Sequence, residues 1–338
     1  MLSSTSPILS VKDLKTYFYQ DEGIVRAVDG VSFDVHPGKT LGIVGESGCG
    51  KSVTARSILR IVDRGGRIEE GEIWLRRARG NGHVDEIDLT KLREDGREIR
   101  SIRGADIALI FQEPMTSLSA FHTVGNQIVE AIRLHKPISR KEAREEAIEL
   151  LRMVGIPRPE RRIDEYSFQL SGGLRQRVMI AMALACDPRI LIADEPTTAL
   201  DVTTQAQILD LLRQLQAEKG LSIILITHDM GVIAEMADEV VVMYLGKVVE
   251  QGPVDDIFHA PKHPYTRSLL RSIPSILAEP RTKLATITGS IPHPYDRPAG
   301  CPFHPRCGDF IAGRCDVREP QLKVVGQGQV VNCFLYDQ

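Results

Sequence analysis

Short apolar segments alternate with amphipathic segments along most of the chain. Four continuous apolar runs have the length of buried strands: residues 40–45 (TLGIVG), 106–111 (DIALIF), 189–193 (RILIA) and 222–227 (SIILIT). The segments that follow the first, second and third of these runs repeat apolar positions at helical spacing. Strands that alternate with helices in this way predict a mostly parallel sheet that is covered by helices on both faces.

Two stretches interrupt this alternation. Between about residues 113 and 180 the pattern is helical without a convincing strand, which predicts a helical subdomain inserted into the sheet domain. Within it, Ser139 and Glu142 have the spacing of a capping box at the start of a helix. Towards the C-terminus prolines become frequent and the periodicity fades. We therefore expect an α/β domain at 1–254 and a small irregular C-terminal domain at 255–338.

The composition narrows the function classes. A chain of 338 residues with 42% apolar residues is long enough for two domains and a substantial core. Its net charge of −3 disfavours a polyanionic partner, so we expect no nucleic acid. The N-terminus does not resemble a secretory signal, and no apolar run reaches the roughly 18 to 20 residues that cross a bilayer. We therefore expect a cytoplasmic chain whose membrane role comes through a partner.

The segment GESGCGKS (45–52) has the pattern of a phosphate-binding P-loop, between a predicted strand and a predicted helix. Backbone N–H groups of such a loop and the helix N-terminus favour an anion. Lys51 is expected to reach the β- and γ-phosphates, and Ser52 to supply an oxygen to Mg²⁺. The alternative is a glycine-rich turn without a ligand. The nucleotide-binding residues predicted in this segment are Gly45, Ser47, Gly48, Cys49, Gly50, Lys51 and Ser52.

The strand pattern ILIADE (190–195) ends in two adjacent carboxylates. In phosphoryl transfer, one acid at such a strand end helps to hold Mg²⁺ and a second group orients the attacking water. We assign Asp194 to the metal and Glu195 to the water. The alternative is that the two acids only open a solvated turn.

The octet LSGGLRQR (170–177) discriminates between the classes of P-loop protein. Together with the other motifs it makes the chain similar to the nucleotide-binding subunits of ABC transporters, whose fold adds N-terminal antiparallel strands to the P-loop core. The resemblance implies that the octet contacts ATP held by the opposite subunit. The residues implied for that contact are Ser171, Gly172, Gly173 and Gln176. Contact within one subunit stays open from the sequence pattern alone.

The resemblance also implies roles for single residues elsewhere. Gln112 corresponds to the Q-loop and a third ligand of Mg²⁺, Asp201 to the D-loop, and His228 to the switch histidine at the γ-phosphate. Catalysis is thus expected from Glu195, His228 and Gln112. Phe18 in TYFY (16–19) is the residue that we expect to stack on adenine, with a core position as its alternative.

Three further segments narrow the resemblance to the ATPases of dipeptide and oligopeptide importers: 120–128 (AFHTVGNQI), 263–274 (HPYTRSLLRSIP) and 291–307 (IPHPYDRPAGCPFHPRC). The resemblance implies ATP-driven peptide import, with oligosaccharides, opines or metal chelates as alternative cargo. It implies two permeases, which dock on residues 113–170, a second homologous ATPase and an extracytoplasmic binding protein. The chain would lie peripherally at the cytoplasmic face of the bacterial inner membrane. ABC ATPases that act on DNA or ribosomes, and stand-alone P-loop kinases, fit the motifs less well.

Four cysteines lie near the C-terminus, separated by five, seven and seventeen residues: Cys301, Cys307, Cys315 and Cys333. Four thiolates suit either Zn²⁺ or an iron–sulfur cluster. Structural zinc sites usually contain ligand pairs two to four residues apart, and this segment has none. The resemblance to the peptide importers implies a [4Fe–4S] cluster, with zinc as the alternative. We expect a structural role, in which the cluster holds together a domain that contacts the partner ATPase.

Overall fold

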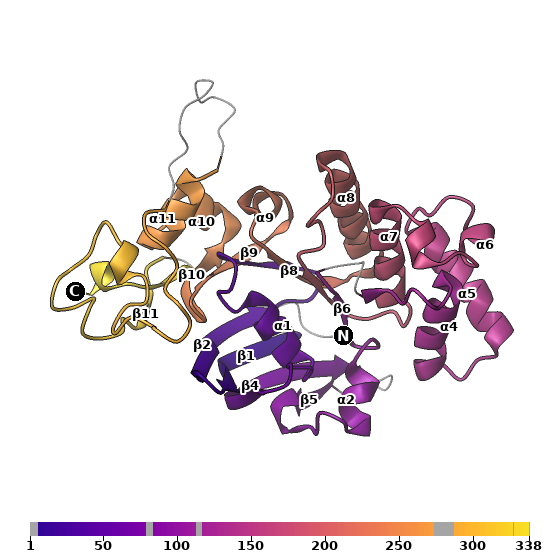
Figure 1. Cartoon of the computed structure of the whole chain (residues 1–338), viewed down its shortest axis with the longest axis horizontal. Coiled ribbons are helices and arrows are strands. Elements are labelled where there is room, and N and C mark those ends of the chain that lie inside the picture. Colours follow the sequence, from indigo (N-terminus) through magenta and orange to yellow (C-terminus); the bar gives the residue numbers. More distant parts are fainter. Residues whose placement is uncertain (1–5, 79–83, 113–116, 274–286, 327, 338) are drawn as a thin grey trace.

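The computed structural model describes residues 6–78, 84–112, 117–273, 287–326 and 328–337. The strands of this part of the chain form two sheets, which Figure 1 shows near the middle of the molecule. The helical subdomain lies at one end of the longest axis and the C-terminal region at the other. None of the helices in the described ranges has the length and apolar character of a membrane span.

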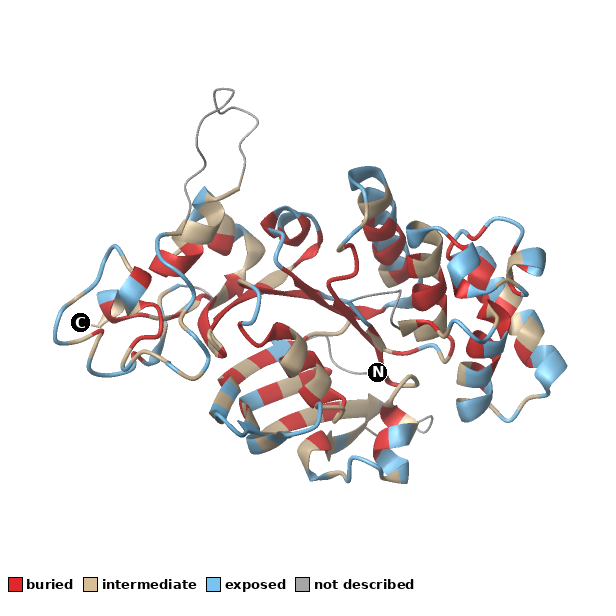
Figure 2. Cartoon of the chain, viewed as in Figure 1, coloured by how far each residue is buried: buried red, intermediate tan, exposed pale blue. Residues whose placement is uncertain are grey.

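The larger sheet has the strand order β11-β12-β10-β9-β3-β8-β7-β6. Neighbours from β9 to β6 are parallel, whereas β10, β12 and β11 are antiparallel. Three of the predicted apolar runs form the strands β3, β7 and β8, whose side chains are buried on both faces (Figure 2), and the fourth forms the edge strand β6. The strands are β3 (Thr40–Val44), β6 (Ile107–Ile110), β7 (Ile190–Asp194), β8 (Ser222–Thr227), β9 (Glu239–Tyr244), β10 (Lys247–Pro253), β11 (Leu322–Val324) and β12 (Val330–Asn332).

The smaller sheet is antiparallel and has the order β2-β1-β4-β5. It confirms the antiparallel strands that the family resemblance implied. The sheet shares a second hydrophobic core with one face of β3, β7 and β8. Its elements are β1 (Leu9–Gln20), β2 (Gly23–Val35), β4 (Gly66–Ala78) and β5 (Val84–Asp88), followed by the short helices η1 (Leu89–Lys91) and α2 (Arg97–Ile102).

Helices occupy the chain between β6 and β7, as the sequence pattern predicted. The capping box is formed: the Glu142 N–H donates to Ser139 Oγ (3.2 Å), and the Ser139 N–H donates to Glu142 Oε2 (2.8 Å). The described elements are α4 (Val124–His135), α5 (Arg140–Met153), α6 (Pro159–Arg162), η2 (Ser167–Gln169) and α7 (Gly172–Ala183).

Three helices connect the parallel strands and place the site residues at the sheet edge. Helix α8 ends at Gly220, whose positive φ of 65° suits glycine at a C-cap. The helices are α1 (Lys51–Ile58) after β3, α8 (Val202–Lys219) after β7 and α9 (Met230–Met236) after β8.

The C-terminal region is built onto the larger sheet. Strand β12 pairs with β10, so the last strands of the chain extend the main sheet. The fully buried Glu250 carboxylate of β10 accepts bonds from the Lys262 and His263 N–H groups and from Gln329 Nε2. Residues after 254, among them Ile257, Tyr265 and Phe303, also belong to the main hydrophobic core. Its remaining elements are α10 (Val254–His259), α11 (Pro264–Arg271), η3 (His304–Arg306) and η4 (Phe334–Tyr336).

Candidate active site

The P-loop connects β3 to α1, as the sequence predicted. Gly50 caps α1 with φ at 102°, and a Cβ there would lie 2.2 Å from the Ala27 carbonyl oxygen, so only glycine fits. Lys51 is buried, and its Nζ donates to the carbonyls of Gly45 (2.7 Å) and Glu46 (3.1 Å). Cys49 is also buried, and its Sγ lies 3.9 Å from Lys51 Nζ.

Ser52 and Asp194 meet across the sheet edge. Ser52 Oγ, in the first turn of α1, donates to Asp194 Oδ1 at 3.0 Å. Burial raises the pKa of the Asp194 carboxyl, and the neighbouring Glu195 raises it further, while the Ser52 hydroxyl opposes this. A buried carboxylate beside a hydroxyl oxygen is a pair of hard oxygen donors, which fits a Mg²⁺ ion with retained waters.

The Glu195 carboxylate contacts side chains of the predicted Q-loop, of its own turn and of the segment that carries the switch histidine. Its Oε2 accepts from Gln112 Nε2 (3.0 Å) and from Thr198 Oγ1 (2.9 Å), and its Oε1 lies 3.4 Å from His228 Nδ1. The structure therefore brings Gln112, Glu195 and His228 together. Thr198 was not predicted, although its position three residues after Glu195 in the same turn could have indicated it.

The backbone at Glu195 adopts a conformation that is rare for its residue type. Its φ is 47°, in the left-handed region, and its N–H donates to the Ile226 carbonyl at 2.8 Å. Such a conformation costs about 1 to 3 kcal/mol and is characteristic of functional turns. The strain directs the carboxylate towards Gln112 and His228 rather than along the strand.

The signature octet begins α7. The Ser171 side chain caps the helix by accepting from the Leu174 N–H, and Ser171 and Gly172 are exposed. Gln176 differs, because only 2% of it is exposed and its buried Nε2 has no hydrogen-bond partner. Ser171 and Gly172 are thus accessible to a partner, whereas the Gln176 side chain lies inside the subdomain and would have to move to reach one.

The D-loop and the aromatic residue occupy defined positions. Asp201 caps α8, accepting from the Thr204 N–H (3.0 Å) and Thr204 Oγ1 (2.7 Å). These bonds lower the pKa of the Asp201 carboxyl, the Thr204 hydroxyl having the largest effect.

Phe18 lies near the end of β1 and is half-buried. Its ring is so close to Gly66 that a Cβ on Gly66 would lie 2.6 Å from the Phe18 ring. The ring therefore packs against Gly66 at the start of β4.

The four C-terminal cysteines lie near one another as free thiols. The Cys301 N–H donates to the Cys315 carbonyl at 2.8 Å. The pKa of Cys301 is raised to about 12 and that of Cys333 to about 11, chiefly by burial and to a smaller extent by neighbouring cysteines of the group. Burial likewise raises the pKa of Cys307. The backbone N–H groups that act in the opposite direction on these three thiols belong to Phe303, Asp309 and Leu335.

The positions of the four thiols bear on the metal prediction. In the described part of the chain, no group of three or more His, Cys, Asp or Glu side chains is arranged to hold a single metal ion. The thiols nevertheless interact electrostatically with one another. The described residues therefore do not show a formed site for the predicted cluster or for a zinc ion.

Comparison with known proteins decides the family. The family model described as "ABC transporter" matches residues 28–198. An oligopeptide transport ATP-binding protein, AppD of Bacillus subtilis, is 49% identical over 334 residues, which cover 98% of each chain. The chain belongs to the ABC transporter ATP-binding proteins.

Other similarities refine this membership. A second family model, "Oligopeptide/dipeptide transporter, C-terminal region", matches residues 249–315. The dipeptide transport ATP-binding protein DppD of Escherichia coli is 47% identical over 96% of each chain. Among solved structures, the dimeric ABC cassette MJ0796 aligns with a TM-score of 0.62 and 31% identity, over 73% of this chain and 98% of the cassette. The chain is thus an ABC ATP-binding protein of the oligopeptide and dipeptide branch.

Proposed function

We propose that this chain hydrolyses ATP to drive the import of peptides through a membrane transporter. The observation that carries the proposal is the convergence of the P-loop, Asp194 and Glu195 at one edge of a parallel sheet, in a chain that resembles peptide transporter subunits over nearly its whole length. The similarity to oligopeptide and dipeptide transport proteins does not favour the alternative cargo of oligosaccharides, opines or other small solutes.

The geometry supports the following mechanism. Lys51 and the P-loop amides bind the phosphates, and the half-buried ring of Phe18 stacks on adenine. Ser52 and Asp194, with Gln112, would hold Mg²⁺, which neutralises charge that develops on the phosphoryl oxygens. Glu195 accepts a proton from the attacking water, and its bonds to Gln112 and His228 fix the orientation of its carboxylate.

A second subunit completes the site in this proposal. Ser171 caps helix α7, and Gly172 and Gly173 begin it, so the free N–H groups of this helix start favour an anion. The D-loop lies beside them, because a Cβ on Gly172 would lie 3.7 Å from Cδ2 of Leu200, the neighbour of Asp201. The similarity to a dimeric cassette supports closure of two such chains around two nucleotides. We propose that the second chain is a homologous ATPase.

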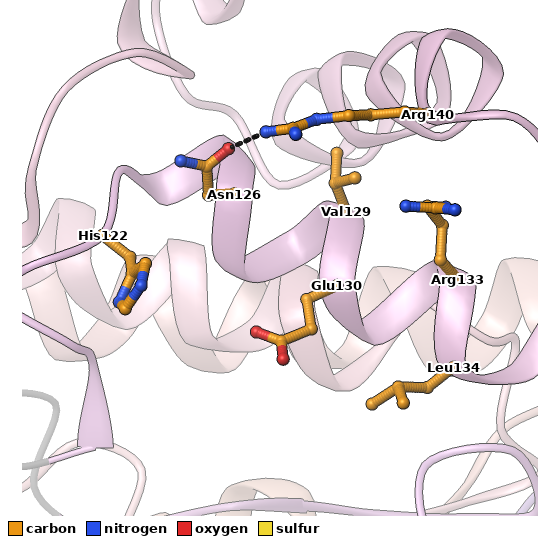
Figure 3. Close-up of a pocket in the computed structure, with 7 residues that line it drawn as sticks. All are labelled: His122, Asn126, Val129, Glu130, Arg133, Leu134 and Arg140. Carbon is orange, nitrogen blue, oxygen red and sulfur yellow. Dashed lines mark hydrogen bonds between the residues drawn. The ribbon is translucent and has the colours of Figure 1, made fainter.

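The helical subdomain offers a surface for the permeases. Helix α4 presents a groove of about 470 Å³, and Figure 3 shows its polar and apolar side chains on one face of the helix. Phe121 and Leu134, at either end of this region, are 89% and 75% exposed, which is unusual for large apolar side chains. The groove is lined by His122, Asn126, Val129, Glu130, Arg133, Leu134 and Arg140.

The C-terminal cysteines are proposed to hold a [4Fe–4S] cluster, with zinc as the alternative. The support is the spacing of four buried or half-buried thiols, which interact with one another, and the backbone N–H groups beside three of them. In this proposal the cluster is structural, and it fixes the loops that carry residues 301–315 against the last strands of the main sheet.

Recovery of the assembled transporter tests the proposed function. The tagged chain should co-purify from native membranes with two permeases and a second ATPase, and the complex should bind an extracytoplasmic peptide-binding protein. The chain would then be peripheral at the cytoplasmic face of the membrane. Recovery of the chain without membrane proteins, or only on DNA, would contradict the proposal.

A further inference from the structure

One residue of the P-loop is bound by the C-terminal region. The Glu46 carboxylate accepts two bonds from the Arg306 guanidinium, from Nη1 to Oε2 at 2.7 Å and from Nη2 to Oε1 at 3.1 Å. The Arg306 side chain is only 4% exposed, and 260 residues separate the two partners. A bidentate pair of this kind fixes orientation as well as distance.

The same P-loop residue is held through its backbone. The Glu46 N–H donates to Tyr265 Oη at 2.9 Å, and Tyr265 is fully buried. Arg306 also donates to Tyr244 Oη at 3.3 Å. The rings of Tyr244 and Tyr265 both pack against Phe303, with centroids 5.3 Å apart in each case. Glu46 is therefore attached to a rigid aromatic cluster that spans β9, α11 and the cysteine loop.

Glu46 in turn contacts the phosphate-binding lysine. Its carbonyl accepts from Lys51 Nζ at 3.1 Å. A shift of Glu46 would change the path of the loop between Gly45 and Gly48, whose N–H groups are expected to bind phosphate. The Arg306–Glu46 ion pair therefore lies next to the N–H groups that are expected to bind phosphate. An ordinary surface salt bridge has no such neighbour.

A second C-terminal segment holds the other side of the nucleotide site. Tyr295 Oη donates to Gln20 Oε1 and Glu22 Oε2 at the turn of the β1–β2 hairpin, shortly after Phe18. Arg297 Nη1 donates to the buried Asp29 carboxylate of β2 at 2.8 Å. The C-terminal region therefore contacts both the P-loop and the hairpin that carries the adenine-stacking candidate.

We propose that Arg306 is a positioning residue for ATP binding, which holds the P-loop of its own subunit in the conformation that accepts phosphate. Tyr265 assists it through the Glu46 N–H. The inference rests on the proposed ATPase function and assigns to the C-terminal region a direct part in it. It does not depend on which metal, if any, the cysteines bind.

The test compares three variants of the full-length chain by calorimetric titration with ATP. Arg306→Gln removes the bidentate pair, and Tyr265→Phe removes only one hydroxyl. The matched control is Arg267→Gln, since Arg267 bonds to Asp309 and Tyr336 within the C-terminal region and not to the P-loop. We expect Arg306→Gln to weaken ATP binding roughly tenfold, in the range typical of coupled sites. Tyr265→Phe should weaken it less, and Arg267→Gln should bind like the wild type.

A kinetic readout separates positioning from general stability. In the assembled transporter, Arg306→Gln should raise the KM for ATP and leave kcat at saturating ATP largely unchanged, because the Glu195 centre is intact. Wild-type ATP affinity in folded Arg306→Gln, or an equal loss in Arg267→Gln, would overturn the inference. If Arg306→Gln does not fold, unchanged affinity in Tyr265→Phe overturns it. A wild-type chain that binds no ATP would instead overturn the proposed function.

Discussion

At the scale of single residues, Glu195 shows how the backbone serves chemistry. It combines a left-handed backbone with three partners, Gln112, Thr198 and His228. The sequence allowed a role to be predicted for Glu195 because two adjacent acids end a buried strand in a chain that also contains a P-loop. In that combination, one acid typically binds Mg²⁺ and the other orients the attacking water. The sequence did not reveal the left-handed turn, because nothing in a Glu side chain favours φ near 47°. That turn is imposed by the surrounding strands.

The first prediction concerns catalysis at Glu195. Glu195→Gln keeps the size and the hydrogen bonds of the side chain but removes its basicity. We expect ATP binding to persist and hydrolysis to fall by roughly 10²- to 10⁴-fold. Lys51→Ala, as the contrast, should lose binding itself. Turnover and affinity are measured separately, and hydrolysis at the wild-type rate in Glu195→Gln would exclude this role.

The second prediction concerns the contact between the signature and α8. A Cβ on Gly173 would lie 2.7 Å from Thr204 Cγ2. Gly173→Ala should therefore lower the free energy of unfolding by about 1 to 3 kcal/mol, as overpacking does. Thr204→Ser removes that methyl group and keeps the hydroxyl bonded to Asp201. The double variant should recover most of the lost stability in thermal unfolding, and failure to recover would show that the clash is not the cause.

At the scale of elements, the sequence predicted the helices and strands that are long and have a clear apolar pattern, and it did not predict the short strands. The central strands and α8 were predicted because five or more buried positions repeat with a clear period. Strands β11 and β12 have three residues each, and Leu322 and Val324 are exposed. Such short segments become strands only because the edge of β10 is available, and this long-range pairing leaves no local pattern in the sequence.

The third prediction concerns the start of α11. His263 caps this helix by accepting from the Tyr265 N–H at Nδ1, and complete burial, with a smaller effect of Arg267, lowers its pKa from 6.5 to about 3. The unfolded chain therefore binds more protons between these pH values. Stability should fall as pH decreases below about 6.5, by up to about 1.4 kcal/mol per pH unit.

The matched variant for this effect is His263→Asn, which retains a capping acceptor and does not titrate. Denaturant unfolding at several pH values between 6.5 and 4.5 should show a shallower loss of stability than in the wild type. Identical pH slopes in the two proteins would mean that His263 is not the group responsible.

At the scale of the whole molecule, the C-terminal region is part of the ATPase rather than an attachment to it. The sequence predicted a separate domain after residue 254, because prolines are frequent there. In the structure this region extends the main sheet, shares its core and reaches the P-loop through Arg306. Contacts between residues 260 positions apart could not be predicted from either local pattern.

The fourth prediction concerns the four cysteines. Anaerobically purified protein should be brown and contain about four irons per chain, as expected for a [4Fe–4S] cluster. Cys307→Ser should lose iron and colour, whereas Cys186→Ser should keep both, because Cys186 follows α7, outside the group. Colourless wild-type protein with one equivalent of zinc would exclude the cluster.

ATP-driven peptide uptake tests the central claim most directly. The transporter purified through this chain would be placed in liposomes with ATP and Mg²⁺ inside, and its peptide-binding protein with labelled dipeptide outside. We predict uptake that requires internal ATP and is abolished by Glu195→Gln in this chain. Uptake that is independent of ATP, or is equal in the wild type and Glu195→Gln, would contradict the claim that this chain powers peptide import.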